Sequence, residues 1–203
     1  MRKISTWVAM GAAAVILGFQ PVQAGLLGMP MGLRSAIQHI KFEANALAPF
    51  AYTQFCARYA DECRKRTMFR GGPVKLTAER WDQLNEVNRT VNRDIAPERN
   101  ELGLAGETWL IGPDRGDCND YAVTKRHQLL AQGWPARALL LSEVVTNSGE
   151  HHLVLVVRTN NADLVLDNLT PSIKPWSRAP YRWVRIQMPD HNRLWATIAS
   201  RRV

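Results

Sequence analysis

The sequence predicts an α+β protein, because its helical and extended patterns are separated along the chain. Between Thr77 and Pro97, apolar residues recur at three- and four-residue steps, which is typical of an amphipathic helix. After Gly133 the pattern changes to short runs of β-branched, aromatic and aliphatic residues joined by short polar turns. Helices followed by closely connected strands favour an α+β fold whose strands pair antiparallel.

The first 24 residues are predicted to be a signal peptide. Two basic residues, Arg2 and Lys3, precede an apolar run at Trp7–Phe19, and Val22–Ala24 supplies a small-residue cleavage site. The apolar run is shorter than the roughly 20 residues of a membrane span; an uncleaved anchor is the alternative. We expect residues 25–203 to form one domain, periplasmic or secreted, with no stable membrane span after cleavage.

The formal net charge of +8 does not indicate nucleic-acid binding. Basic residues are scattered among acids along the chain, and the densest basic stretch, Arg64–Arg70, lacks a recognised binding motif. We therefore exclude nucleic acid as a partner. We interpret the excess basic residues as solvated surface charges, which also attract the protein to anionic envelope surfaces.

Residues 48–66 are expected to be helical and contain a predicted disulfide between Cys56 and Cys63. A near pair of cysteines in an exported protein favours a bond, whereas two separate buried thiols are the alternative. Seven residues of unbroken helix rise about 10.5 Å, which exceeds the roughly 7 Å between bridged Cα atoms. A bonded pair therefore requires the helix to end or turn between the two cysteines. The aromatics spaced to share a face are Phe50, Phe55 and Tyr59.

Two further helices are expected before the strands. One begins after Thr77, a favourable N-cap, and ends near Pro97. A loop over residues 96–116 follows. The next helix begins at Asp117 or Cys118 and runs to Gln132, before Gly133. The expected strands are Leu139–Val145, Leu153–Val157, Leu164–Leu166 and Tyr181–Ile186.

Cys118, His152 and Asp167 are the candidate catalytic residues. Cys118 stands where a loop becomes a helix, and the partial positive charge of a helix N-terminus favours a thiolate. His152 opens one predicted strand and Asp167 closes the next, so antiparallel pairing brings them together. These types suit a nucleophile, its general base and a carboxylate that orients the imidazole. Taken singly, each has a structural alternative: a core cysteine, a hairpin histidine and a turn aspartate.

Three motifs resemble those of the bacterial transglutaminase-like cysteine peptidases (BTLCP). Gly116–Ala122 is similar to the nucleophile motif, His152–Leu155 to the histidine motif and Leu166–Leu169 to the aspartate motif. Their order and spacing agree with the family, and the resemblance extends from about Phe50 to Ile186. Any one motif alone would be weak evidence, whereas the combination is specific.

The resemblance implies a papain-like, transglutaminase-like core in which a cysteine-bearing helix packs on an antiparallel sheet. It implies a periplasmic hydrolase that cleaves peptide bonds through a thioester. Relatives of the LapG type cleave large surface adhesins, so a protein or peptide substrate such as an adhesin is expected. His152 fits the histidine motif because an apolar triplet follows it directly, and His151 is the alternative.

The resemblance also makes calcium a candidate cofactor; no other is expected. In adhesin-cleaving relatives, acidic residues beside the nucleophile take part in calcium binding. Asp117 matches this pattern, but Asn119 stands where those relatives carry a glutamate, which weakens a site for calcium. Alternatively, Asp117 and Asp120 stabilise the helix start; both oppose ionisation of Cys118.

Trp109 is a candidate for lining the cleft or the oxyanion site, with core packing as the alternative. The backbone amide of Cys118 is a candidate oxyanion donor. Two other functions compete with proteolysis. A transglutaminase or amidase would use the same triad, and a non-catalytic envelope binding module would keep only the scaffold.

Overall fold

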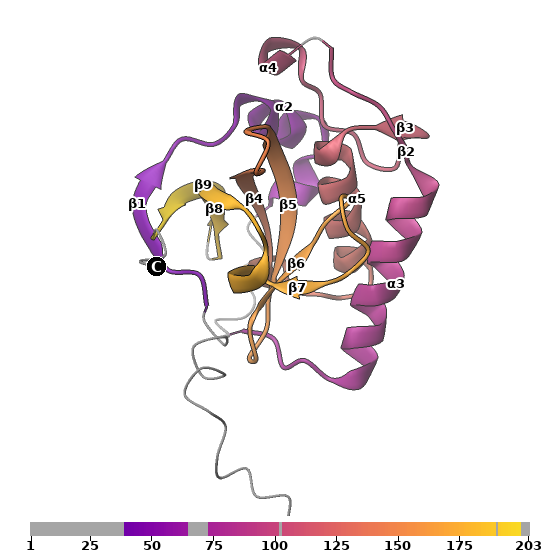
Figure 1. Cartoon of the computed structure of the whole chain (residues 1–203), viewed down its shortest axis with the longest axis vertical. Helices are drawn as coiled ribbons and strands as arrows, with labels where there is room; N and C mark the ends of the chain where they lie inside the picture. The colour runs from indigo at the N-terminus through magenta and orange to yellow at the C-terminus, as the bar shows by residue number, and fades with distance from the viewer. Residues whose placement is uncertain (1–38, 65–72, 102, 190, 200–203) are drawn as a thin grey trace, which may run out of the picture.

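The computed structural model describes residues 39–64, 73–101, 103–189 and 191–199 (Figure 1). The predicted signal peptide lies outside these residues. The helices are α2 (Phe50–Arg58), α3 (Ala78–Asp94), α4 (Gly103–Gly106) and α5 (Cys118–Ala131), with 3-10 turns η1 (Ala60–Cys63), η2 (Ala136–Ala138) and η3 (Trp176–Arg178). The strands are β1 (Phe42–Ala46), β2 (Ala96–Pro97), β3 (Arg115–Gly116), β4 (Leu139–Val145), β5 (His151–Arg158), β6 (Asp163–Leu166), β7 (Lys174–Pro175), β8 (Arg182–Met188) and β9 (His191–Ile198).

Within the described residues, one antiparallel sheet of seven strands has the order β1-β9-β8-β4-β5-β6-β7. Strands β4, β5 and β6 follow one another in the chain and are joined by two hairpins, with His152 opposite Val144 and Leu155 opposite Leu166. Gly149 lies at positive φ (87°) in the β4–β5 turn, where glycine is favoured. The α+β class and the antiparallel sheet are therefore confirmed.

Strands β1, β2, β3, β7 and β9 were not expected from the sequence, and β2, α4 and β3 lie within residues 96–116, which were predicted to be a loop. β9 pairs with β1 although the two strands lie near opposite ends of the sequence; Phe42, for example, is opposite Ile198. This pairing depends on sequence-distant contacts, which a local pattern does not reveal. The N-terminal strand β1 thus closes the edge of the sheet formed by the C-terminal strand.

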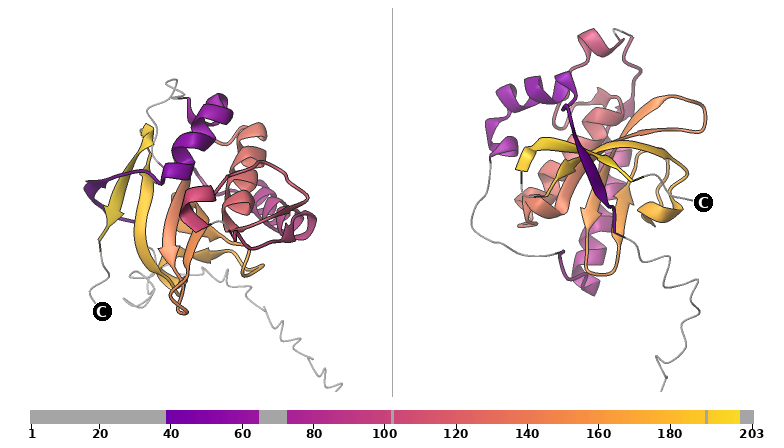
Figure 2. Two further views of the ribbon diagram at one scale, coloured as in Figure 1. Left: turned by 90° about the horizontal axis from the view of Figure 1, so that it is seen from above. Right: turned by 90° about the vertical axis from the view of Figure 1, so that its left-hand side faces the viewer.

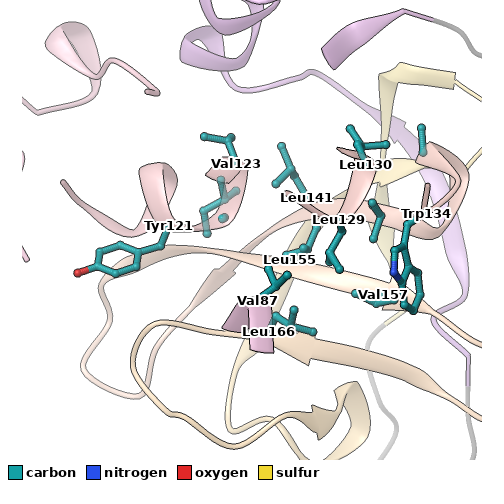
Figure 3. Close-up of a cluster of buried hydrophobic side chains, with 14 of the residues drawn as sticks. Val87, Tyr121, Val123, Leu129, Leu130, Trp134, Leu141, Leu155, Val157 and Leu166 are labelled. Atoms are coloured by element: carbon teal, nitrogen blue, oxygen red, sulfur yellow. The ribbon is translucent and has the colours of Figure 1, made fainter. Parts of the chain in front are cut away.

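Helix α5 lies between the sheet and α3, so it is the central helix of the molecule (Figures 1 and 2). Its apolar side chains meet those of α3 and of the central strands in one core (Figure 3). Alternate residues of β5 enter this core, while the intervening ones enter a second core on the other face. The residues of the first core that Figure 3 labels are Val87, Tyr121, Val123, Leu129, Leu130, Trp134, Leu141, Leu155, Val157 and Leu166.

A disulfide joins Cys56 and Cys63, with 5.5 Å between their Cα atoms. As the spacing requires, α2 ends at Arg58 and the chain tightens into η1, whose last residue is Cys63. The expected helix over residues 48–66 is therefore shorter than predicted. Phe55 is buried, but Phe50 is 68% exposed because it is the first residue of α2 and projects beyond the core.

Helix α3 matches its prediction closely. The Thr77 side chain accepts a hydrogen bond from the backbone N–H of Arg80 (3.3 Å), which satisfies one free donor of the first turn. Leu84, Val87 and Val91 are buried in the core. In the part of the chain that the structure describes, no helix has the length and apolar character of a membrane span.

Candidate active site

The N-terminus of α5 is fixed by a reciprocal pair of hydrogen bonds, a capping box. The carboxylate of Asp117, the N-cap residue, accepts from the backbone N–H of Asn119 (2.9 Å). The carboxylate of Asp120 accepts from the backbone N–H of Asp117 (3.0 Å) and of Leu110 (2.7 Å). The predicted helix start is correct, and Cys118 is the first residue of α5.

The Cys118 thiol is not readily ionised in this environment. Burial raises the pKa of the thiol to about 12, and the carboxylates of Asp117, Glu107 and Asp120 act in the same direction. A hydrogen bond from the backbone of Leu153 opposes this shift without overcoming it. Asp117 and Asp120 thus oppose ionisation of Cys118, as expected, and burial adds a larger effect that the sequence did not reveal. The same burial explains why Asp120 has a pKa raised to about 6.

His152 and Asp167 form the buried hydrogen bond that their strand positions predict. The distance from His152 Nε2 to Asp167 Oδ1 is 2.9 Å, and both side chains are almost fully buried. The backbone N–H of Leu169 also donates to Asp167 Oδ1 (3.0 Å). Burial alone would raise the pKa of Asp167, but the hydrogen bonds and charge of His152 together with the Tyr181 hydroxyl lower it.

A cleft of about 680 Å³ connects these residues. Cys118 and His152 both line it, and the thiol accepts its hydrogen bond from Leu153, the residue directly after His152. Asp167 is 2% exposed and lies behind His152. Cys118 and His152 therefore share one cleft, and Asp167 contacts His152 from outside its lining.

Glu107 is a cleft residue that the sequence did not single out. Its carboxylate accepts hydrogen bonds from the indole N–H of Trp109 (3.0 Å) and from the side-chain amide of Asn119. Burial raises the pKa of Glu107 despite these bonds, and nearby Asp117 adds to the effect. Glu107 and Asp117 therefore concentrate negative charge at the head of α5.

Trp109 serves mainly the core, as the alternative interpretation held. It is 2% exposed, and its ring lies 5.8 Å from that of Tyr52 and 6.1 Å from that of Phe55, centre to centre. One edge still borders the cleft, where its N–H binds Glu107. Trp109 thus fixes a cleft carboxylate through its polar edge and packs through its apolar surface.

His151, the alternative histidine, points into a different network. It is exposed, and its Nδ1 lies 2.6 Å from Glu143 Oε1. Glu143 in turn accepts from Arg185 Nε (2.5 Å), which ties β4 to β8 at the rim of the cleft. The geometry therefore favours His152 over His151 as the partner of Asp167.

Tyr181 and Asn92 bond Asp167, and Lys125 interacts with it electrostatically; local pattern gave no signal for these residues. The hydroxyl of Tyr181, directly before β8, donates to Asp167 Oδ2. Asn92, on α3, donates to the backbone carbonyl of Asp167 (2.9 Å). Burial lowers the pKa of Lys125, on α5, to about 7, whereas Asp167 opposes that shift. Helix α3, expected only to pack the core, thus also positions the chain at Asp167.

Comparison with known proteins identifies the family of the chain. The family profile of the bacterial transglutaminase-like cysteine proteinases, BTLCP, matches residues 42–203. The chain belongs to this family, which places it among the transglutaminase-like cysteine proteases. A comparison with curated proteins finds no match.

Solved structures of LapG from Legionella pneumophila are similar to the chain. Calcium-bound LapG has a TM-score of 0.50 and 25% identity, over 61% of this chain and 73% of that one. A second LapG structure has a TM-score of 0.48 and 25% identity, over 57% of this chain and 66% of that one. The chain thus spans about two thirds of the length of LapG in this match.

Proposed function

We propose that the protein is an exported cysteine peptidase that uses Cys118 as nucleophile, His152 as general base and Asp167 as the orienting carboxylate. The observation that carries the proposal is the 2.9 Å bond between His152 Nε2 and Asp167 Oδ1, in a cleft shared with the first residue of α5. Family membership over residues 42–203 supports the same chemistry.

The proposed reaction begins with a neutral thiol, because the pKa of Cys118 is raised to about 12. Asp167 engages Nε2 of His152, which leaves Nδ1 as the nitrogen that accepts the proton. As that proton moves, Cys118 Sγ bonds to the peptide carbonyl carbon. The imidazolium then returns the proton to the leaving amine as the C–N bond breaks, giving a thioester that water hydrolyses.

The developing oxyanion needs donors at the head of α5. The backbone N–H of Cys118 is one of the unpaired amides of the first helical turn, which makes it our proposed oxyanion donor. The capping box holds this amide in a fixed orientation because both flanking carboxylates are bonded to the backbone. A preorganised donor of this kind stabilises the transition state without rearrangement.

We infer that the substrate is a protein in the cell envelope or on its surface, such as an adhesin. The open cleft admits an extended peptide, and the family comprises proteinases. Residues 1–24 are proposed to export the chain to the periplasm, and residues 25–203 to form a single peptidase domain.

Calcium is proposed as a weakly held ion at Asp117 and Asn119, and one LapG structure is calcium-bound. The charge around Cys118 suits a cation, but Asp117 Oδ1 already accepts a backbone hydrogen bond. Among the described residues, no three His, Cys, Asp or Glu side chains are grouped to hold a metal. These residues therefore fit a low-affinity site without a complete set of protein ligands.

A calcium titration tests this site without measuring activity. We expect calcium on the order of 10⁻³ M to raise the melting temperature of the native chain. Asp117→Asn should abolish the rise yet keep the helix cap, because asparagine is an equally good N-cap. An equal rise in both proteins, or none in either, would reject calcium at Asp117.

A further experiment tests whether water or an amine accepts the acyl group from the thioester. It uses glutamine-containing casein and a fluorescent primary amine, dansylcadaverine. A peptidase should release new amino termini and incorporate little amine. Amine incorporation faster than hydrolysis would instead identify a transglutaminase. Cys118→Ala should abolish whichever activity is found, and activity that survives this change would exclude Cys118 as nucleophile.

A further inference from the structure

The Asp167 carboxylate is held from both of its oxygens. Oδ1 accepts from His152 Nε2 (2.9 Å) and from the backbone N–H of Leu169 (3.0 Å). Oδ2 accepts from the hydroxyl of Tyr181. The side chain is 2% exposed, so water has little access to replace the phenol.

Tyr181 reaches Asp167 from a distant strand of the sheet. It directly precedes β8, whereas Asp167 directly follows β6, and β4 and β5 lie between these two strands. The ring of Tyr181 lies 5.6 Å from that of His152, centre to centre, with the planes inclined at 55°. Tyr181 therefore contacts both His152 and Asp167 and connects them to the start of β8.

The protonation states of Tyr181 and Asp167 suit a hydrogen bond in which the phenol donates and the carboxylate accepts. Burial raises the pKa of Tyr181, and the hydrogen bond and charge of Asp167 raise it further, so the phenol keeps its proton at neutral pH. Although burial opposes ionisation of Asp167, its hydrogen bonds from His152 and Tyr181 lower its pKa. The carboxylate is thus charged, and a charge-assisted bond from the phenol is the result.

We propose that Tyr181 is a positioning residue, whose hydroxyl fixes the Asp167 carboxylate in the orientation that binds His152 Nε2. This inference rests on the proposed triad and extends it by one residue. Without the hydroxyl, the carboxylate loses its only described side-chain partner on Oδ2 and gains freedom to rotate. The imidazole then spends less time in the tautomer and orientation that leave Nδ1 available to the thiol.

The test follows the Nε2 proton of His152 by NMR in the full mature chain. A buried imidazole N–H bound to a carboxylate exchanges slowly with water, and His152→Ala assigns its resonance. Tyr181→Phe keeps the ring and removes the hydroxyl. We expect exchange of this proton to accelerate roughly tenfold to a hundredfold, the equivalent of one charge-assisted hydrogen bond. Unchanged exchange would overturn the proposal.

Tyr52→Phe is the matched control. Tyr52 is buried in the core, and its hydroxyl hydrogen-bonds Gln187 rather than the triad. A general loosening of the fold would accelerate exchange in both variants, which would contradict a specific role for Tyr181. If Tyr181→Phe does not fold, 3-fluorotyrosine at position 181 supplies a more acidic donor. Slower exchange is then expected, and no change would overturn the proposal.

The result of this NMR test can be distinguished from the result of a test for the proposed peptidase activity. The Nε2 resonance requires no substrate, so it reports on Tyr181 whether or not Cys118 cleaves peptides. Activity surviving in Cys118→Ala would remove the peptidase mechanism while leaving the Tyr181–Asp167 linkage intact. Tyr181→Phe should also raise the pKa of Asp167, measured by carbon NMR of its carboxyl group, because a donor to the charged form is lost.

Discussion

Cys118 is subject to two opposing influences at the scale of a single residue. The N-terminus of α5 favours the thiolate, whereas burial and three nearby carboxylates favour the thiol and raise its pKa to about 12. The sequence revealed two of these carboxylates, Asp117 and Asp120, because they flank the cysteine. Glu107 and the burial itself depend on how the loop before β3 folds over α5, so no local motif predicts them.

Alkylation of Cys118 by iodoacetamide should therefore rise about tenfold for each pH unit between pH 7 and pH 9, without a plateau. The reason is that the thiolate fraction is small throughout this range. Mass spectrometry of the labelled protein measures the rate, and Cys118 is the free cysteine that the structure records. The unfolded chain with its disulfide intact is the control, because labelling of its Cys118 thiol should level off near the ordinary pKa of about 8.5. A plateau near neutral pH in the folded protein would contradict the raised pKa.

At the scale of an element, α5 is anchored at both ends. Its first turn depends on Gly116, where an added Cβ would lie 2.8 Å from Asp120 Cβ, too close for an undisturbed capping box. Further along, Arg126 is 1% exposed and donates to the Glu62 carboxylate (2.8 Å) and to the Leu139 carbonyl (3.2 Å). The disulfide next to Glu62 thus connects to the helix that carries Cys118.

Gly116→Ala should displace Asp120 and lower the free energy of unfolding by about 1 to 3 kcal/mol, because a methyl group enters a packed site. Urea denaturation measures this loss. Thr77→Ala is the control: it removes the N-cap of α3 and should cost about 1 kcal/mol. Only Gly116→Ala should also change the alkylation rate of Cys118, and equal effects in both variants would refute the link.

Glu62→Ala should lower the free energy of unfolding by about 3 to 5 kcal/mol, because it leaves the buried Arg126 guanidinium without its carboxylate. Asp61→Ala is the neighbouring control. Asp61 pairs with Arg64 at the surface, where both side chains are exposed, and the expected cost is below about 1 kcal/mol. Similar losses in the two variants would show that the buried pair has no special weight.

At the scale of the whole molecule, the sequence predicted what local pattern determines. The start of α5, the Thr77 cap and the β4–β5 hairpin follow from short motifs, and they place His152 opposite Val144. Long-range pairing was missed, including β1 with β9, as was Tyr181, whose role arises only when strands far apart in sequence fold together. Motifs therefore identified the candidate triad, whereas its supporting residues required the tertiary structure.

The most direct test of the triad compares amino termini in the envelope fraction of cells that carry the native chain or one of three variants. We expect a set of cleavage products to disappear with Cys118→Ala and with His152→Ala, because each change removes a reacting group. His151→Ala should retain them, since its side chain binds Glu143 rather than Asp167. Products that persist in Cys118→Ala, or that vanish with His151→Ala but not with His152→Ala, would contradict the account.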